Sequence, residues 1–227
     1  GEAGNALHGT FRHSHVNFGV SCTTGVSGQN YSNLTVGGGI GNVVGAAYST
    51  VAGGLTNRAI GIGAAIGGGA GNVAGDATPD TAATVAGGYV NAATGMFAMV
   101  GGGYGNLASG THSVVGGGNC DTASGIYAAV AGGYHNTADL MYAAVGGGAN
   151  NHARGSNSVV SGGAGNSASG NTSVVAGGQT NVASAMYSTV SGGISNTASG
   201  RCATVPGGEW CQASGPYSFA AGYSARA

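Results

Sequence analysis

The sequence has very few charged side chains. It contains no lysine, and charged residues make up 5% of its 227 residues, with a net charge of −1. A typical soluble domain has roughly 25% charged residues. A nucleic-acid interface needs clustered basic side chains, so this composition gives no electrostatic basis for binding nucleic acid. Disorder driven by charge repulsion is excluded for the same reason.

Other signatures are also missing. No apolar run approaches the ~20 residues of a membrane-spanning helix. Three prolines and no Gly-X-Y period exclude collagen. No C-x-x-C pair points to a structural zinc site, and the six acidic residues are scattered rather than paired. We therefore expect no enzyme activity, no cofactor and no metal site.

What the chain does contain is a repeat of the form V-x-G-G-x-x-N-x-A-S-G-x-Y-S-x. We number the unit from its leading valine as position 0. The step is fifteen residues except between Ile66 and Val85, where four extra residues lie within 76–82. Position 0 is occupied by Val36, Val51, Ile66, Val85, Val100, Val115, Val130, Val145, Val160, Val175, Val190 and Val205. A fixed short period of this kind is typical of a solenoid.

Each unit contains two short runs of alternating side chains separated by glycine. The density of glycine and the lack of a 3.6-residue pattern exclude helix. We expect one run at positions 12 to 0 and another at positions 6 to 8. The glycine pair at positions 2 and 3 and the S-G pair at positions 9 and 10 would form the turns, where glycine favours φ > 0. The predicted fold is all-β, a parallel β-solenoid (β-roll) of about twelve 15-residue rungs, each with two short strands ~4.8 Å from those of the next rung.

Alternation also predicts the interior of the solenoid. Valine or isoleucine at position 0, serine or alanine at position 13 and alanine at position 8 would form a thin, dry core. Asparagine recurs at position 6, where it predicts either a stacked amide ladder or a separate Asx-turn or left-handed role in each rung. The asparagines are Asn42, Asn57, Asn72, Asn91, Asn106, Asn136, Asn151, Asn166, Asn181 and Asn196.

The two ends of the chain differ from the repeat. Residues 1–35 do not fit it, and we interpret them as an N-terminal cap or docking arm, with residues 36–227 as the solenoid domain. The last unit stops within a rung, and an exposed rung favours strand addition. This pattern predicts end-to-end contact with another copy, in addition to any contact between copies lying side by side.

One predicted surface is a stripe of apolar residues at positions 12 and 14. Alternation would place the side chains of both positions on the outer face of the sheet, and no repeat has a charged residue at either position. Monomers rarely expose a long apolar stripe, so we expect a self-association interface. Its members are Tyr48, Phe97, Met99, Val114, Tyr127, Tyr142, Val159, Val174, Tyr187, Tyr217 and Phe219.

The chain has four cysteines: Cys22, Cys120, Cys202 and Cys211. An even number in a chain without lysine favours an oxidising, extracellular setting. We expect a local disulfide between Cys202 and Cys211, with free buried thiols as the alternative.

The run SFAAGYSARA, together with the recurring SVV-GGG-x-x-N-x-ASG units, resembles the head repeats of YadA-like trimeric autotransporter adhesins. Similar repeats occur in bacterial surface and tail-fibre-like proteins. The resemblance covers residues 36–227. It implies a left-handed parallel β-roll, packing of three chains around one axis and binding to host surface molecules.

These observations predict a structural or adhesive element of an extracellular fibre or cell surface. Its expected partners are copies of itself, as a trimer or a filament, and a host-surface protein or glycan. Two alternatives remain, an ice-binding solenoid and a phage tail-fibre module that binds carbohydrate. A regular threonine array would favour the first, but Met99, Val114, Ala129 and Phe219 interrupt position 14. A paired-acid groove would favour carbohydrate cleavage, and the sequence shows none.

Overall fold

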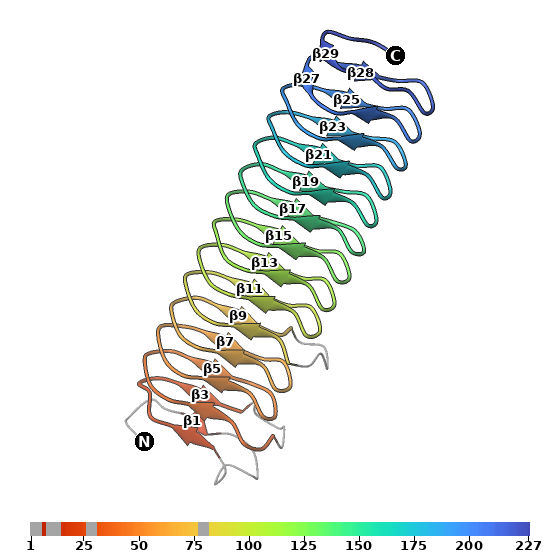
Figure 1. Cartoon of the computed structure of the whole chain (residues 1–227). Coiled ribbons are helices and arrows are strands. Elements are labelled where there is room, and N and C mark those ends of the chain that lie inside the picture. Colours follow the sequence, from red (N-terminus) through yellow and green to blue (C-terminus); the bar gives the residue numbers. More distant parts are fainter. Residues whose placement is uncertain (1–5, 8–14, 26–30, 77–81) are drawn as a thin grey trace. The chain divides into compact units, whose positions relative to one another are not determined.

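The computed structural model describes residues 6–7, 15–25, 31–76 and 82–227. The chain falls into two compact units, Gly1–Gly118 and Asn119–Ala227. Each unit is an all-β parallel solenoid, and Figure 1 shows the successive turns of each. Together the units have about 13 turns of about 15 residues, with two short strands per turn and no helix in the described part of the chain. The predicted fold class is confirmed.

The first unit contains two parallel sheets whose strands alternate along the chain. One sheet has the order β1 (Ala6–Leu7), β3 (Thr23–Thr24), β5 (Val43–Val44), β7 (Arg58–Ala59), β9 (Val73–Ala74), β11 (Ala92–Ala93) and β13 (Leu107–Ala108). The other has the order β2 (Val16–Asn17), β4 (Thr35–Val36), β6 (Thr50–Val51), β8 (Ala65–Ile66), β10 (Thr84–Val85), β12 (Met99–Val100) and β14 (Val114–Val115).

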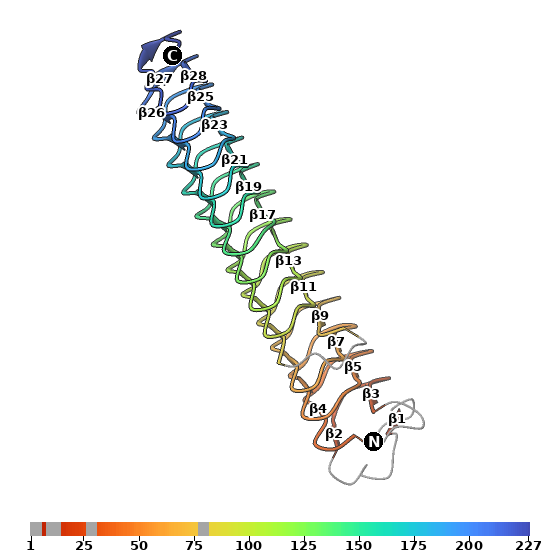
Figure 2. The same ribbon diagram turned by 90° about the vertical axis from the view of Figure 1, so that its right-hand side faces the viewer.

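The second unit repeats this arrangement. Its first sheet contains β15 (Thr122–Ala123), β17 (Thr137–Ala138), β19 (His152–Ala153), β21 (Ser167–Ala168), β23 (Val182–Ala183), β25 (Thr197–Ala198) and β28 (Gln212–Ala213). Its second contains β16 (Ala129–Val130), β18 (Ala144–Val145), β20 (Val159–Val160), β22 (Val174–Val175), β24 (Thr189–Val190) and β26 (Thr204–Val205). A short pair, β27 (Gly208–Glu209) and β29 (Gly222–Tyr223), follows. Figure 2 gives the view that separates the two sheets of a turn.

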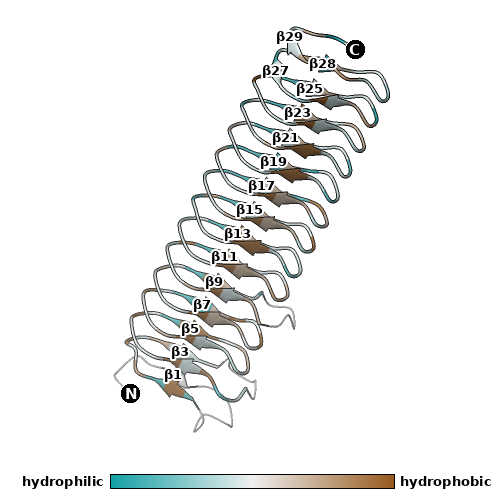
Figure 3. Cartoon of the chain, in the orientation of Figure 1, coloured by the Kyte–Doolittle hydropathy of each residue, from teal (hydrophilic) through white to brown (hydrophobic). Residues whose placement is uncertain are grey.

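The core of each unit consists of columns of identical small residues. The valine or isoleucine at position 0 and the residue at position 8, which is alanine except for Val44, are buried in every repeat, as are the serines and alanines at position 13 up to Ala203. Hydrophobic and hydrophilic positions therefore recur from turn to turn, as Figure 3 shows. This outcome confirms the predicted core, because position-by-position alternation decides which side chain points inward.

Left-handed backbone angles occur at three positions of each turn. Position 3 is always glycine, with φ between +83° and +117°. Position 5 has φ between +52° and +67°, and position 12 between +56° and +68°, and at both the residue is usually not glycine. The prediction that the S-G pair needs left-handed glycine is therefore wrong. At Gly155 of that pair, a Cβ atom would instead lie 2.0 Å from the carbonyl oxygen of Gly170 in the next turn.

The turns differ from the prediction in two further ways. Each strand has two residues, so position 12 lies in a corner rather than in the strand that holds positions 14 and 0. A third column of single parallel bridges also runs through position 4, for example from Ile40 to Leu55. We call the residues at positions 11 and 12 the corner, and those at position 4 the bridge column.

The described residues that precede Val36, which were predicted to form a cap or docking arm, also contribute strands to the two sheets. β2 pairs with β4, and β3 pairs with β5, so residues within 15–25 continue both sheets. Asn17 lies opposite Val36, and Cys22 occupies the place of the ladder asparagine. The insertion behaves as expected, because β10 pairs with β8 in register after it. Residues 77–81 lie outside the described part.

Candidate self-association surface

The corner displays the aromatic residues that the sequence singles out. At Tyr142, the backbone N–H donates to the carbonyl of Ile126 in the preceding turn at 3.0 Å. Equivalent bonds join Tyr187 to Asn171 and Tyr217 to Arg201. These bonds hold position 12 in its left-handed conformation, and the side chain projects from the edge of the turn. Strand alternation, on which the prediction relied, therefore applies to position 14 and not to position 12.

The predicted interface residues are largely exposed in the single chain. Tyr127, Tyr142 and Tyr187 are 48%, 51% and 50% exposed, and Tyr217 is 70% exposed. Tyr48, Phe97, Met99, Val114 and Phe219 are also exposed, whereas Val159 and Val174 are half-buried. The residues divide between the units: Tyr48, Phe97, Met99 and Val114 belong to the first, and the other seven to the second.

Only some of these residues contact one another. The rings of Tyr127 and Tyr142 are stacked, with centroids 5.2 Å apart. Phe97 stacks on His112 at 5.0 Å, and Met99 lies opposite Val114 in the paired strands β12 and β14. Val159 lies opposite Val174 in β20 and β22. In the second unit, exposed Ile126, Leu140 and Met141 enlarge the corner around the two stacked tyrosines.

The bridge column is an apolar surface that was not predicted from the sequence. In the first unit it contains exposed Val20, Ile40, Leu55, Tyr89 and Tyr104. In the second unit the same column is mixed and includes Asn119, Gln179 and Glu209. The fifteen-residue spacing of the apolar members was a visible signal. It was overlooked because position 4 falls in a stretch that was interpreted as a turn.

The asparagines at position 6 form a hydrogen-bonded ladder in each unit. The Oδ1 atom of Asn136 accepts the backbone N–H of Asn151, and Nδ2 donates to the carbonyls of Gly132 and Gly148 at 3.0 and 2.9 Å. In the first unit, neighbouring side chains also contact each other directly, as Asn57 and Asn42 do at 3.2 Å. The ladder asparagines are buried and none has a left-handed φ. The left-handed alternative is therefore wrong, and the residue before each asparagine adopts that conformation.

Cys202 and Cys211 are both free thiols in this structure, so the predicted disulfide between them is not formed. Cys211 is buried at the ladder position, where its N–H donates to Asn196 Oδ1 at 2.9 Å. Its Sγ donates to the carbonyl of Gly222 at 3.2 Å. Cys202 is a half-buried corner residue at position 12. The two thiols thus lie in different columns of the solenoid, the ladder and the corner. Their short separation in the sequence does not show this.

Asp121 replaces asparagine in the ladder of the second unit. It is buried, and one carboxyl oxygen accepts the N–H of Asn136 at 2.7 Å. Burial raises the pKa of this carboxyl above its usual value of 3.8, although Asn136 and the charge of His135 oppose the shift. The other ladder side chains place an NH₂ group against glycine carbonyls. An aspartate therefore matches its site best when it is protonated.

The substitution Asp121→Asn is expected to stabilise the protein at neutral pH by about 1–3 kcal/mol. The pKa of Asp121 is higher in the folded protein than in the unfolded chain, so protonation of its carboxyl stabilises the folded state. This stabilisation is complete at a pH below the unfolded-state pKa. That stability is lost as the pH rises through the folded-state value. The measurement is urea unfolding of both proteins from pH 3 to 8. The advantage of D121N should shrink as the pH falls toward ~3.8, and a difference that does not depend on pH would contradict this account.

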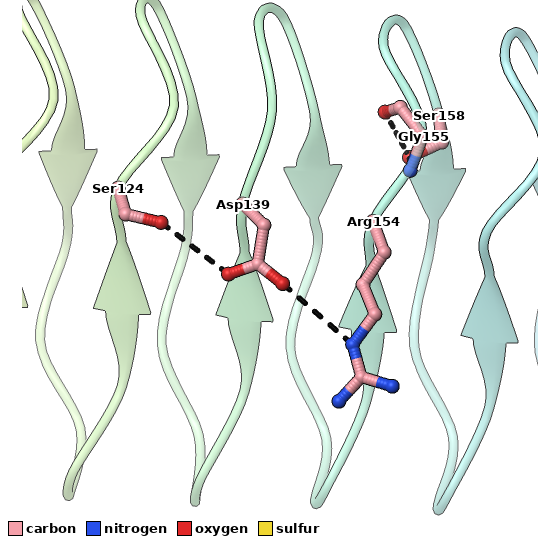
Figure 4. A network of polar contacts seen from close by, with 5 residues as sticks. All are labelled: Ser124, Asp139, Arg154, Gly155 and Ser158. Atoms are coloured by element: carbon pink, nitrogen blue, oxygen red, sulfur yellow. Dashed lines mark hydrogen bonds and ion pairs between the residues drawn. The ribbon is translucent and has the colours of Figure 1, made fainter.

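One polar network lies on the surface of the second unit. Ser124 donates to Asp139 at 3.3 Å, and Arg154 Nε lies 3.6 Å from the other carboxyl oxygen (Figure 4). Figure 4 also shows the bond from the Ser158 hydroxyl to the Gly155 carbonyl within one turn. The ion pair is half-exposed, so it contributes little to stability. Burial and the charge of Arg154 lower the pKa of neighbouring His152, which Asp139 partly offsets.

The described residues contain neither a metal-binding cluster nor a membrane-spanning helix. Within the ranges that the structure describes, no three His, Cys, Asp or Glu side chains gather into a metal-binding group. The same residues include no helix with the length and hydropathy required to cross a bilayer. No family model matches the chain. Comparison with curated proteins gives no match either.

Proposed function

We propose that this protein is a structural or adhesive element of an extracellular fibre and that it associates with copies of itself through the corner. The observation that carries the proposal is the exposure of Tyr127, Tyr142 and Tyr187 in the position-12 column, which contains no charged residue. The resemblance to adhesin heads supports the cell-surface location, an arrangement of three chains, and a host-surface protein or glycan as a further partner.

The energetics favour burial of the corner. A half-exposed tyrosine leaves about 100 Å² in contact with water. Burial of that area contributes about 2.5 kcal/mol at 25 cal/mol per Å². The exposed aliphatic residues Ile126, Leu140 and Met141 add to the same patch. Aromatic and methionine side chains are the groups that enrich the centres of protein interfaces.

A second copy of the chain is the partner whose surface matches the corner in spacing. Corner residues recur once per turn, at the ~4.8 Å separation of paired strands. A copy of the same solenoid presents side chains with the same repeat, so its ridges fit between those of the first over several turns. The low charge of the chain means that little electrostatic repulsion opposes such a contact.

The test replaces Tyr127, Tyr142 and Tyr187 with serine. We expect the triple variant to retain the circular dichroism of the parent and to associate at least ten-fold more weakly in sedimentation velocity and electron microscopy. A matched control replaces Tyr89, Tyr104 and Tyr134 with serine, which removes three tyrosines of similar exposure from the bridge column. Equal association of the two variants, or a parent protein that stays monomeric at high concentration, would refute the proposed interface.

A further inference from the structure

Two pairs of tyrosines on adjacent turns are stacked face to face. Tyr89 and Tyr104 in the first unit have ring centroids 5.7 Å apart and an interplanar angle of 10°. Tyr127 and Tyr142 in the second unit have centroids 5.2 Å apart and an angle of 8°. The pairs lie in different columns, one at the bridge column and one at the corner. Neither pair belongs to the buried core, since all four side chains are about half-exposed.

The backbone keeps the members of each pair in register. Tyr89 and Tyr104 form a parallel bridge, and the N–H of Tyr89 donates to the carbonyl of Gly103 at 2.9 Å. Tyr127 and Tyr142 have the same φ of +58°, and the turn that carries Tyr142 is bonded to the preceding one through Ile126. The two phenols of a pair therefore stay about one strand spacing apart at their backbones.

This geometry points to a chemical modification, and we propose that each stacked pair is a site of oxidative cross-linking to dityrosine. The oxidant is hydrogen peroxide acting through a haem peroxidase. Each phenol loses one electron and one proton to become a phenoxyl radical. The two radicals join through a carbon ortho to each oxygen, and the hydrogen on each of those carbons moves to the oxygen. One peroxide takes up the two electrons and two protons and becomes two waters.

The stack brings the rings close without placing them in the bonding geometry. To form the bond, the two rings tilt so that their ortho edges meet. Exposure of about half of each side chain leaves room for this motion and gives the oxidant access to the phenols in the unassociated chain. Because the partner ring is already held in place, the second radical meets it at a high effective concentration. Coupling within a chain is therefore favoured over coupling between chains in dilute solution.

The remaining tyrosines of similar exposure provide an internal comparison. Tyr134 also lies in the bridge column and is 49% exposed, but its column neighbours are Asn119 and Ala149. It has no tyrosine on an adjacent turn of that column. Tyr134 thus matches Tyr89 and Tyr104 in exposure and column, but its ring contacts the ring of His135 edge-on at 4.3 Å and has no tyrosine to couple with. The inference does not depend on the self-association proposed above.

The test treats the purified protein at low micromolar concentration with a haem peroxidase and hydrogen peroxide. We expect dityrosine fluorescence in the monomer fraction and a loss of two hydrogens in mass for each bond. Digestion and tandem mass spectrometry should identify Tyr89 joined to Tyr104 and Tyr127 joined to Tyr142. Dityrosine that appears only between chains, or links that use Tyr134 as often as the paired residues, would overturn the proposal.

Conservative variants complete the test. The double variant Tyr89→Phe with Tyr127→Phe should lose at least nine-tenths of the intrachain dityrosine, because each pair then lacks one phenol. The control Tyr134→Phe should form as much as the parent protein. Circular dichroism checks that each variant is folded before oxidation. A double variant that still forms intrachain dityrosine at the parental level would show that the stacked pairs are not the sites.

Discussion

Alanine in place of Gly163 is expected to lower the free energy of unfolding by about 3 kcal/mol or more. Gly163 lies at position 3 with φ +89°, and an added Cβ would lie 2.2 Å from the carbonyl oxygen of Gly178. That oxygen belongs to the backbone of the next turn and also accepts the ladder amide of Asn166. The chain must therefore move both the turn and its hydrogen bonds to fit one methyl group.

The adjacent residue provides the control. A Cβ at Gly162 meets no atom within 4 Å, and its φ is not left-handed. The substitution Gly162→Ala should change stability by no more than about 0.5 kcal/mol. Urea unfolding followed by circular dichroism measures both variants. If the two variants had equal free energies of unfolding, the contact between Gly163 and the next turn would not be as close as the structure shows.

Removal of one ladder side chain is expected to have a comparable effect. The substitution Asn181→Ala removes the acceptor for the N–H of Asn196 and the donor to the carbonyls of Gly177 and Gly193. These groups are buried or partly buried. The carbonyl of Gly193 keeps the N–H of Gln179 as a donor, so two groups lose their partner. At about 1–3 kcal/mol for each of these two groups, the expected loss is about 4 kcal/mol. Urea unfolding at neutral pH measures it.

Two further substitutions separate the ladder bonds from a general loss of asparagine. Asn171→Ala removes an exposed asparagine and should change stability by less than about 0.5 kcal/mol. Asn181→Asp keeps one oxygen as an acceptor but replaces the NH₂ group. It should be destabilised at neutral pH and recover part of the loss in acid, where the carboxyl becomes a donor. Equal stability of N181A and N171A would contradict the importance assigned to the ladder.

The interior of the solenoid could be predicted from the sequence because each interior position has a single chemical requirement. Position 0 needs a β-branched side chain that fills a thin core, and position 8 needs a methyl group beside it. Repetition of the same residues every fifteen positions makes these requirements visible without homologues. The insertion within 76–82 did not obscure them, since the columns resume at Ala83.

The corners could not be predicted in the same way. Left-handed angles at Tyr142 and His135 contradict the intrinsic preference of these residues, which is outweighed by hydrogen bonds to the preceding turn. The rung that precedes Val36 was missed because its strands pair at spacings of 19 and 20 residues rather than 15. Cys22 also occupies the ladder position of that rung, so the asparagine that marks most repeats is absent from it.

The ladder in the second unit also bears on how such a protein changes its length during evolution. Asn136, Asn151, Asn166, Asn181 and Asn196 each accept from the following turn through the same atom and donate to glycines at the same offsets. Every turn is therefore interchangeable with its neighbour as far as these bonds are concerned. A gene that gains or loses one whole fifteen-residue module keeps these ladder bonds between the remaining turns, whereas an insertion within a strand turns the side chains that follow it to the opposite face. Selection on such a sequence can adjust its number of modules without a new packing solution.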